Sequence, residues 1–197
     1  VIRDIEPHDS VERYTSLGVQ VLQGHARITS PWTVAVTLAD GTVQTLTTRN
    51  IVIAAGASPF VPPIPGLKEA GFHTSDTVWG LTELPRRLVV LGGGPIGSEL
   101  AQSFARLGSA VTQVEMAPRI MVREDPEVSE LVAASLRADG VQLLTGHQAV
   151  RVEVVDGAHG REKRLVATHQ GAEVVIPFDE LLCAVGRTPR VAGYGLE

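Results

Sequence analysis

The alternation of apolar and polar residues is most regular between positions 88 and 115. A run of four apolar residues, Leu88–Leu91, leads into six residues that are rich in glycine. Apolar residues then recur at helical spacing over Ile96–Leu107, and Gly108 follows as a typical helix end. A second apolar run, 110–114, ends at an acid, Glu115. The pattern predicts a strand, a glycine turn, a helix and a second strand.

The turn carries the first candidate chemistry. Its residues in order are Gly92, Gly93, Gly94, Pro95, Ile96 and Gly97. The glycine spacing is the dinucleotide-binding fingerprint: Gly92 allows the tight turn, Gly94 lets a pyrophosphate approach, and Gly97 lets the helix pack closely. The N–H groups at the helix start then face the phosphates. A bare structural turn is the alternative.

Glu115 is the second candidate of this unit. It stands about 20 residues after the glycines, where a carboxylate can bind the adenosine ribose hydroxyls. This position favours NAD over NADP, because a 2′-phosphate there would meet a like charge. Arg119 and Arg123 are the counter-evidence, since arginines near this strand end can hold a 2′-phosphate. A plain exposed strand end is the alternative for Glu115.

The segments before this unit predict a helix end, a short strand and a hairpin. They cover residues 3–17, 18–25, 33–38 and 43–47, and Asp40-Gly41 is the hairpin turn signal. The continuous apolar run Ile51–Ala54 is typical of a strand buried on both faces. The proline-rich stretch 59–66 predicts an extended linker and a domain boundary.

The segments after Glu115 predict a helix and further strands. Asp125 is a good N-cap, with Pro126 at the first helical position. The expected buried face of this helix consists of Val128, Leu131, Val132 and Leu136. A strand meander is expected over residues 149–156, 163–169 and 172–176, and a buried strand over 181–184.

The chain contains an internal repeat. Residues 140–147 read G-V-Q-L-L-T-G-H, and residues 18–25 read G-V-Q-V-L-Q-G-H. A meander and a buried apolar run ending near a glycine follow each copy. The repeat indicates two related nucleotide-binding domains. Only the second copy is preceded by a fingerprint turn, so we expect the first fingerprint upstream of Val1 and interpret the chain as a fragment.

Composition narrows the function classes. The chain has 197 residues, 44% of them hydrophobic, and a net charge of −5. Without a basic stripe, we expect no nucleic-acid partner. No apolar run is long enough to cross a membrane, and no signal peptide is visible, so the cytoplasm is the expected location. Six histidines lack zinc-ligand spacing, so no metal site is expected. Cys183, the single cysteine, lies in the middle of an expected strand, and this place indicates a core position rather than a redox role.

Four motifs together resemble a known family. They are Gly24-His25-Ala26, Ala54-Ala55-Gly56-Ala57, residues 92–102 and Gly186-Arg187-Thr188-Pro189. The set resembles the class I pyridine nucleotide-disulfide oxidoreductases, and is most similar to the mercuric reductase and dihydrolipoamide dehydrogenase branch. In that family an upstream domain holds FAD, a central domain holds NAD(P), and a C-terminal domain forms the homodimer.

The resemblance implies an α/β fold. Residues 60–185 are expected to form an NAD(P)-binding, Rossmann-like doubly wound parallel sheet with a β-meander. Residues 1–59 are expected to be part of an incomplete second Rossmann-like domain that binds FAD. Residues 186–197 are expected to return toward that FAD domain.

The resemblance also implies site residues. Ala26, Ala55, Gly56 and Ala57 would approach FAD; Gly92, Gly93, Gly94, Pro95, Ile96 and Gly97 would hold the nicotinamide cofactor's pyrophosphate; Ala149 and Gly186 would border that cofactor. Glu99 would lie near the nicotinamide–flavin contact as the catalytic candidate, and a solvated helix residue is its alternative. Pro95 departs from the tyrosine that many members carry there, and the family's redox cysteine pair is absent from this chain.

The expected function is therefore that of a fragment. The parent would pass hydride from a nicotinamide to FAD, and on to a disulfide-type or metal acceptor; the isolated piece would bind the nicotinamide dinucleotide and be inactive. The alternatives are a nucleotide-sensing module without chemistry, and a related NADH oxidase or ferredoxin reductase.

Overall fold

The computed structural model describes residues 2–157 and 160–197, and the chain divides into two compact units. One unit contains the residues up to Gly56 together with Pro189–Glu197, and the other contains Ala57–Thr188. No helix in the described part of the chain is both long and apolar enough to span a membrane.

A parallel sheet forms the centre of the unit Ala57–Thr188. Its strands are β5 (Arg87–Leu91), β6 (Ala110–Glu115), β7 (Gln142–Thr145) and β11 (Glu180–Cys183), in the order β11-β5-β6-β7. Each adjacent pair is parallel. Strand β5 is apolar on both faces: Leu88 and Val90 join one buried cluster, and Val89 and Leu91 join the other. This is the pattern of a sheet covered on both sides.

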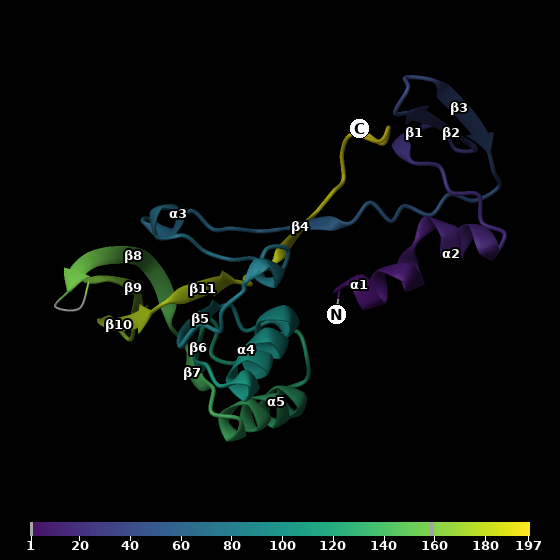
Figure 1. Cartoon of the computed structure of the whole chain (residues 1–197). Coiled ribbons are helices and arrows are strands. Elements are labelled where there is room, and N and C mark those ends of the chain that lie inside the picture. Colours follow the sequence, from purple (N-terminus) through teal and green to yellow (C-terminus); the bar gives the residue numbers. More distant parts are fainter. Residues whose placement is uncertain (1, 158–159) are drawn as a thin grey trace. The chain divides into compact units, whose positions relative to one another are not determined.

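Helices α4 (Pro95–Leu107) and α5 (Pro126–Ala138) pack against the cluster that contains Leu88 and Val90 (Figure 1). The predicted bounds of α4 are confirmed, and Gly108 ends it with φ +110°. The predicted buried face of α5 is wrong at two positions, because Val128 is 43% exposed and Leu131 is 73% exposed. The face that packs is Ser129, Ala133 and Leu136. Its small residues let the helix approach closely, and the Ser129 hydroxyl donates a hydrogen bond to the Ile120 carbonyl.

A three-stranded antiparallel meander covers the other face of the sheet. It consists of β8 (Gln148–Gly157), β9 (Gly160–His169) and β10 (Ala172–Phe178), in the order β10-β9-β8. Val152, Leu165 and Phe178 pack with Val89 and Leu91 in one buried cluster. The predicted parallel sheet with a meander is confirmed. Short elements complete this unit: β4 (Ala57–Pro59), α3 (Leu67–Ala70), η2 (Val78–Gly80) and β12 (Arg187–Pro189), whose last residue is counted with the other unit.

The other unit contains a second antiparallel meander. Its elements are α1 (Ile2–Ile5), η1 (Glu6–Asp9), α2 (Val11–Ser16), β1 (Gly24–Ser30), β2 (Thr33–Leu38) and β3 (Val43–Thr47). The sheet order is β1-β2-β3, and the predicted hairpin at Asp40-Gly41 is confirmed. Val36 is the one buried apolar side chain among this unit's described residues.

Two strands predicted in this unit are not formed. Residues 18–23 and 51–54 adopt no strand, and Val52 is 88% exposed. A strand that is buried on both faces needs neighbouring strands to pair with. Among the residues that the structure describes, no strand pairs with either segment.

Candidate functional site

A cavity of about 1150 Å³ lies at the carboxyl ends of β5, β6 and β11. Eight of the predicted site residues line it: Gly92, Gly93, Gly94, Pro95, Ile96, Glu115, Ala149 and Gly186. In open α/β sheets, ligands bind in the crevice outside the carboxyl ends of the strands. The fold thus brings residues from four separate segments to the place where this architecture binds ligands.

Two glycines of the turn are required by close packing. Gly92 has φ +111°, and a Cβ there would lie 2.5 Å from the carbonyl oxygen of Ala184. A Cβ on Gly97 would lie 2.4 Å from the carbonyl oxygen of Gly92. The tight turn at Gly92 and the close helix packing at Gly97 are therefore built as the fingerprint predicts.

Gly94 differs from both, because nothing in the protein fills the space beside it. A Cβ on Gly94 would meet no heavy atom within 4 Å, and Gly94 lines the cavity. Gly94 is also the N-cap of α4, where no side chain of the described residues caps the helix. The positive end of the helix dipole is thus open to the cavity, as an anion site requires.

Glu115 is fixed by two backbone amides. Its Oε2 accepts a hydrogen bond from the Gly93 N–H at 2.6 Å, and its Oε1 accepts one from the Ala117 N–H at 2.7 Å. An ionised carboxylate has about four lone-pair sites, so each oxygen can accept another hydrogen bond. A Cβ on Gly93 would lie 2.9 Å from the Glu115 side chain. The sequence did not predict that Gly93 must lack a side chain in order to make room for Glu115.

The two arginines weighed against NAD have different surroundings. The Arg119 guanidinium donates hydrogen bonds to the carbonyl oxygens of Met121 at 3.0 Å and Val122 at 2.9 Å, and Arg119 does not line the cavity. Arg123 is exposed and does line the cavity. Of these two arginines, Arg123 is therefore the one whose position allows contact with a ligand in the cavity.

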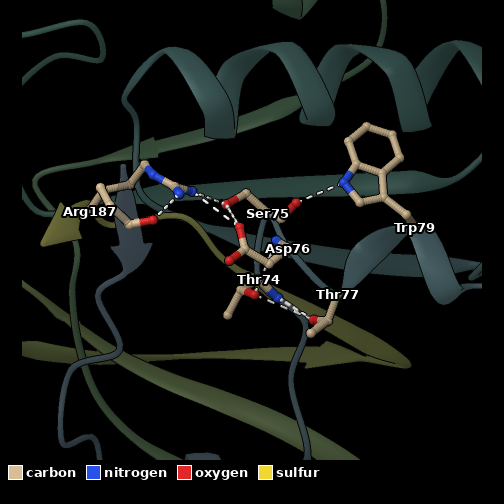
Figure 2. Close-up of polar contacts among 7 residues, drawn as sticks. Thr74, Ser75, Asp76, Thr77, Trp79 and Arg187 are labelled. Carbon is tan, nitrogen blue, oxygen red and sulfur yellow. Dashed lines mark hydrogen bonds and ion pairs between the residues drawn. The ribbon is translucent and has the colours of Figure 1, made fainter. Parts of the chain in front are cut away.

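Figure 2 shows a cluster of polar contacts around Arg187 and the turn 74–77. Arg187 Nη1 donates to Ser75 Oγ at 2.9 Å and to Asp76 Oδ1 at 3.2 Å, while Nη2 donates to the Ala57 carbonyl oxygen at 2.5 Å. Trp79 Nε1 donates to the Ser75 carbonyl oxygen on the same turn. Ser75 and Arg187 both line the cavity. The sequence carries no signal for these contacts, because the partners of Arg187 lie far away in the chain.

Cys183 and His147 also line the cavity. Cys183 is 1% exposed, and its burial raises the pKa of the thiol, as expected for a core residue rather than a redox group. The His147 ring stacks on His169 with 4.1 Å between ring centroids. Among the described residues, no three His, Cys, Asp or Glu side chains are grouped as metal ligands.

The remaining predicted residues lie outside the cavity lining. Glu99 is exposed on α4, and Gly97 is buried behind the turn. Ala26, Ala55 and Gly56 belong to the other unit. Ala57 lies on β4, where its carbonyl accepts the hydrogen bond from Arg187. The roles given to these residues stay predictions.

Comparison with known proteins identifies the fold and family. The family described as pyridine nucleotide-disulphide oxidoreductase matches residues 3–197. The chain is 36% identical to a mercuric reductase of Staphylococcus aureus, covering 96% of this chain and 32% of that protein. It is 37% identical to a dihydrolipoyl dehydrogenase of Pseudomonas aeruginosa, covering 100% of this chain and 43% of that protein.

A solved structure agrees with these relatives. The HOCl-induced flavoprotein disulfide reductase RclA from Escherichia coli superposes with a TM-score of 0.67 at 30% identity, over 92% of this chain and 40% of that one. The chain thus spans about a third to two fifths of the length of the proteins it matches. With the family match over nearly all of its residues, the chain belongs to the pyridine nucleotide-disulphide oxidoreductase family.

Proposed function

We propose that this chain supplies the nicotinamide dinucleotide site of an FAD-dependent oxidoreductase. The observation that carries the proposal is Gly94: it lines the cavity at the uncapped start of α4, and the space beside it is open. The pyrophosphate would lie against Gly94 and the first-turn amides of α4. Glu115 would accept hydrogen bonds from the ribose hydroxyls, and the backbones of Ala149 and Gly186 would border the ligand.

The parent enzyme is proposed to pass reducing equivalents onward from this site. When bound, the dinucleotide supplies a hydride, and the protein supplies binding, orientation and electrostatics. The names of the relatives, mercuric reductase and dihydrolipoyl dehydrogenase, support a metal or disulfide-type acceptor. They favour an enzyme over a nucleotide-sensing module. Glu99 is the proposed residue near the nicotinamide–flavin contact, and residues 1–59 and 186–197 are proposed to belong to the FAD-binding part of a homodimeric parent.

The proposed coenzyme is NAD rather than NADP. Glu115 is oriented by Gly93 and Ala117, so its charge stays at the end of β6. A 2′-phosphate at this point would meet that charge, whereas a 2′-hydroxyl can donate to it. Arg119 does not oppose this assignment, because its guanidinium is engaged with two carbonyl oxygens.

The experiment that tests the dinucleotide site is the substitution Gly94→Val. A branched side chain would take the place of the pyrophosphate, while the fold should survive because a Cβ at this position meets no heavy atom within 4 Å. We expect calorimetric titration to show NADH binding weakened by about tenfold or more, which corresponds to about 1.4 kcal/mol. The melting temperature should stay close to that of the wild type.

Gly80→Val is the matched control. Gly80 also has open space beside it and lies outside the cavity lining, so this variant should bind NADH as the wild type does. A folded Gly94→Val variant with unchanged NADH affinity would show that the pyrophosphate does not lie at this turn. Absence of any NADH binding by the wild-type chain would reject the proposed function itself.

A further inference from the structure

One fully buried polar side chain lies directly beneath the glycine turn. Gln113 is on β6 and is 0% exposed, on a strand of the central sheet whose Val111 and Val114 are also buried. Its Nε2 donates to the Gly92 carbonyl oxygen at 3.0 Å and to Ser98 Oγ at 3.2 Å. Its Oε1 has no hydrogen-bond partner among the residues that the structure describes.

The orientation of this amide follows from its partners. The Gly92 carbonyl can only accept a hydrogen bond, so the nitrogen of the Gln113 amide must face it. The oxygen is then turned to a side where no described residue donates a hydrogen bond to it. A buried acceptor without a partner costs free energy of folding, and a native protein that keeps one calls for an explanation.

The two partners of Nε2 lie on the two sides of the turn. Gly92 leaves β5, and Ser98 is in the first turn of α4. A single amide therefore joins the end of the strand to the start of the helix. Gly97 makes the approach close enough, since a Cβ there would lie 3.4 Å from Gln113 Nε2 and 2.4 Å from the Gly92 carbonyl oxygen.

We propose that Gln113 is a positioning residue for the pyrophosphate of the dinucleotide. It fixes the distance and angle between the Gly92 end of the turn and the first-turn amides of α4, which are the groups that face the anion. The inference rests on the proposed function of the cavity. This positioning role also explains why position 113 is polar. An apolar side chain of equal length would fill the same core position without leaving a buried oxygen unpaired.

The test compares ligands with and without a pyrophosphate. Gln113→Met keeps the length of the side chain and removes the donor. We expect its affinity for NADH and for ADP-ribose to fall by roughly five- to tenfold, which is within the range that loss of one hydrogen bond between uncharged groups gives. Its affinity for adenosine should change by less than about twofold. A residue that only supports the fold would weaken all three ligands alike, and that result would overturn the proposal.

Two further variants complete the test. Gln142→Met is the matched control, because Gln142 is exposed on β7, accepts a hydrogen bond from Thr112 Oγ1, and lies outside the cavity lining. It should bind all three ligands as the wild type does. If Gln113→Met does not fold, Ser98→Ala removes one of the two contacts from the helix side. We expect this variant to show the same selective loss of affinity for NADH and ADP-ribose, with about half the change in log Kd.

Hydrogen exchange without any ligand separates this inference from the proposed function. In Gln113→Met, amides of residues 92–98 should exchange faster, while those of β8, β9 and β10 should not change. Unchanged exchange at the turn, together with intact NADH binding by the wild type, rejects the role of Gln113 alone. Failure of the wild type to bind NADH or ADP-ribose rejects the proposed function and, with it, the pyrophosphate role.

Discussion

At the scale of single residues, the protein's own hydrogen bonds hold the charged groups of the cavity in place. Glu115 has both carboxylate oxygens hydrogen-bonded to backbone amides, and Arg187 has its guanidinium shared among three acceptors. Groups held in this way lose little conformational freedom on binding, which favours affinity. In the proposed function, the lone pairs left on Glu115 would accept hydrogen bonds from the ribose hydroxyls of the dinucleotide.

Glu115 therefore gives a prediction about coenzyme choice. A hydrogen bond to a charged group contributes about 1.5–3 kcal/mol, so Glu115→Ala should weaken NADH binding on the order of 10- to 150-fold. NADPH affinity should stay level or rise, because the like charge is gone. Glu115→Gln, which keeps the shape of the side chain, should give a smaller loss in the same direction. Fluorescence titration of both coenzymes measures these affinities.

The control for this prediction is Glu127→Ala, which removes an exposed acid in the first turn of α5 outside the cavity lining. It should leave both affinities unchanged. The assignment to NAD is contradicted if the wild type binds NADPH more tightly than NADH and Arg123→Ala removes that preference. Arg119→Ala is the less informative variant, because Arg119 is engaged with the loop carbonyls.

At the scale of elements, β5 and β11 are joined by a carboxylate as well as by their ladder. Asp179 lies just before β11; its Oδ2 accepts from the Arg87 N–H at 2.8 Å, and its Oδ1 accepts from Arg87 Nη2 at 2.8 Å. Burial raises the pKa of Asp179, but the hydrogen bonds and charge of Arg87 outweigh it, and the pKa of this carboxyl is lowered overall. The native state thus favours the ionised form.

The lowered pKa of Asp179 determines how its contribution to the free energy of unfolding changes with pH. A carboxyl with a lowered pKa in the folded state stabilises the protein above its unfolded pKa of about 3.9, and this contribution is lost as pH falls through the folded value. Asp179→Asn should lower the free energy of unfolding at pH 7 by about 0.5–1.5 kcal/mol, a value reduced because the pair is partly exposed. It should also flatten the loss of stability below pH 4.

Urea unfolding at pH 7 and at several values below pH 4 measures this effect. Asp156→Asn, at an exposed position on β8, serves as the control and should leave the midpoint at pH 7 within error of the wild type. An Asp179→Asn variant whose acid sensitivity equals that of the wild type would show that the Arg87–Asp179 contact does not couple folding to pH.

Elements could be predicted from sequence where local signals agree. The order β5, α4, β6 was readable because apolar runs, glycines and helical spacing all lie within one short stretch. The run Ile51–Ala54 was misjudged because strand formation depends on partner strands, which an apolar run does not specify. The packed face of α5 was predicted only in part, at Val132 and Leu136. Ser129 and Ala133 were missed because they are small or polar, and periodicity weighs large apolar residues more.

The site was predictable to a similar extent. The fingerprint located the turn and Glu115, since their spacing is part of the motif. It could not indicate Gln113 or Arg187, because their partners depend on tertiary structure. Arg187 binds Ser75 and Asp76, which lie more than a hundred residues away in the chain. The sequence does not distinguish Gln113 from an ordinary polar residue of a strand, although the structure places it against the Gly92 carbonyl.

At the scale of the whole molecule, the two units differ in how much apolar surface they bury. Both buried clusters consist of residues between Ile64 and Ala184, whereas Val36 is the one buried apolar side chain described in the other unit. Stability within a protein follows buried contacts, and segments with few of them open at low free energy. Ligand binding should add to this difference, because the cavity is lined by one unit alone.

Native-state hydrogen exchange on the whole chain tests this expectation. Amides of β5, β6 and β11 should exchange only through unfolding of the unit that contains them, and amides of β1, β2 and β3 should exchange at a much lower free energy. NADH at about 100 times its Kd should add about 2.7 kcal/mol of protection to the first group, because a ligand stabilises the state that binds it. The second group should be unaffected. Equal protection of both groups without ligand, or protection by NADH that appears in β1–β3 and not in residues 92–97, would contradict the assignment of both stability and binding to the unit Ala57–Thr188.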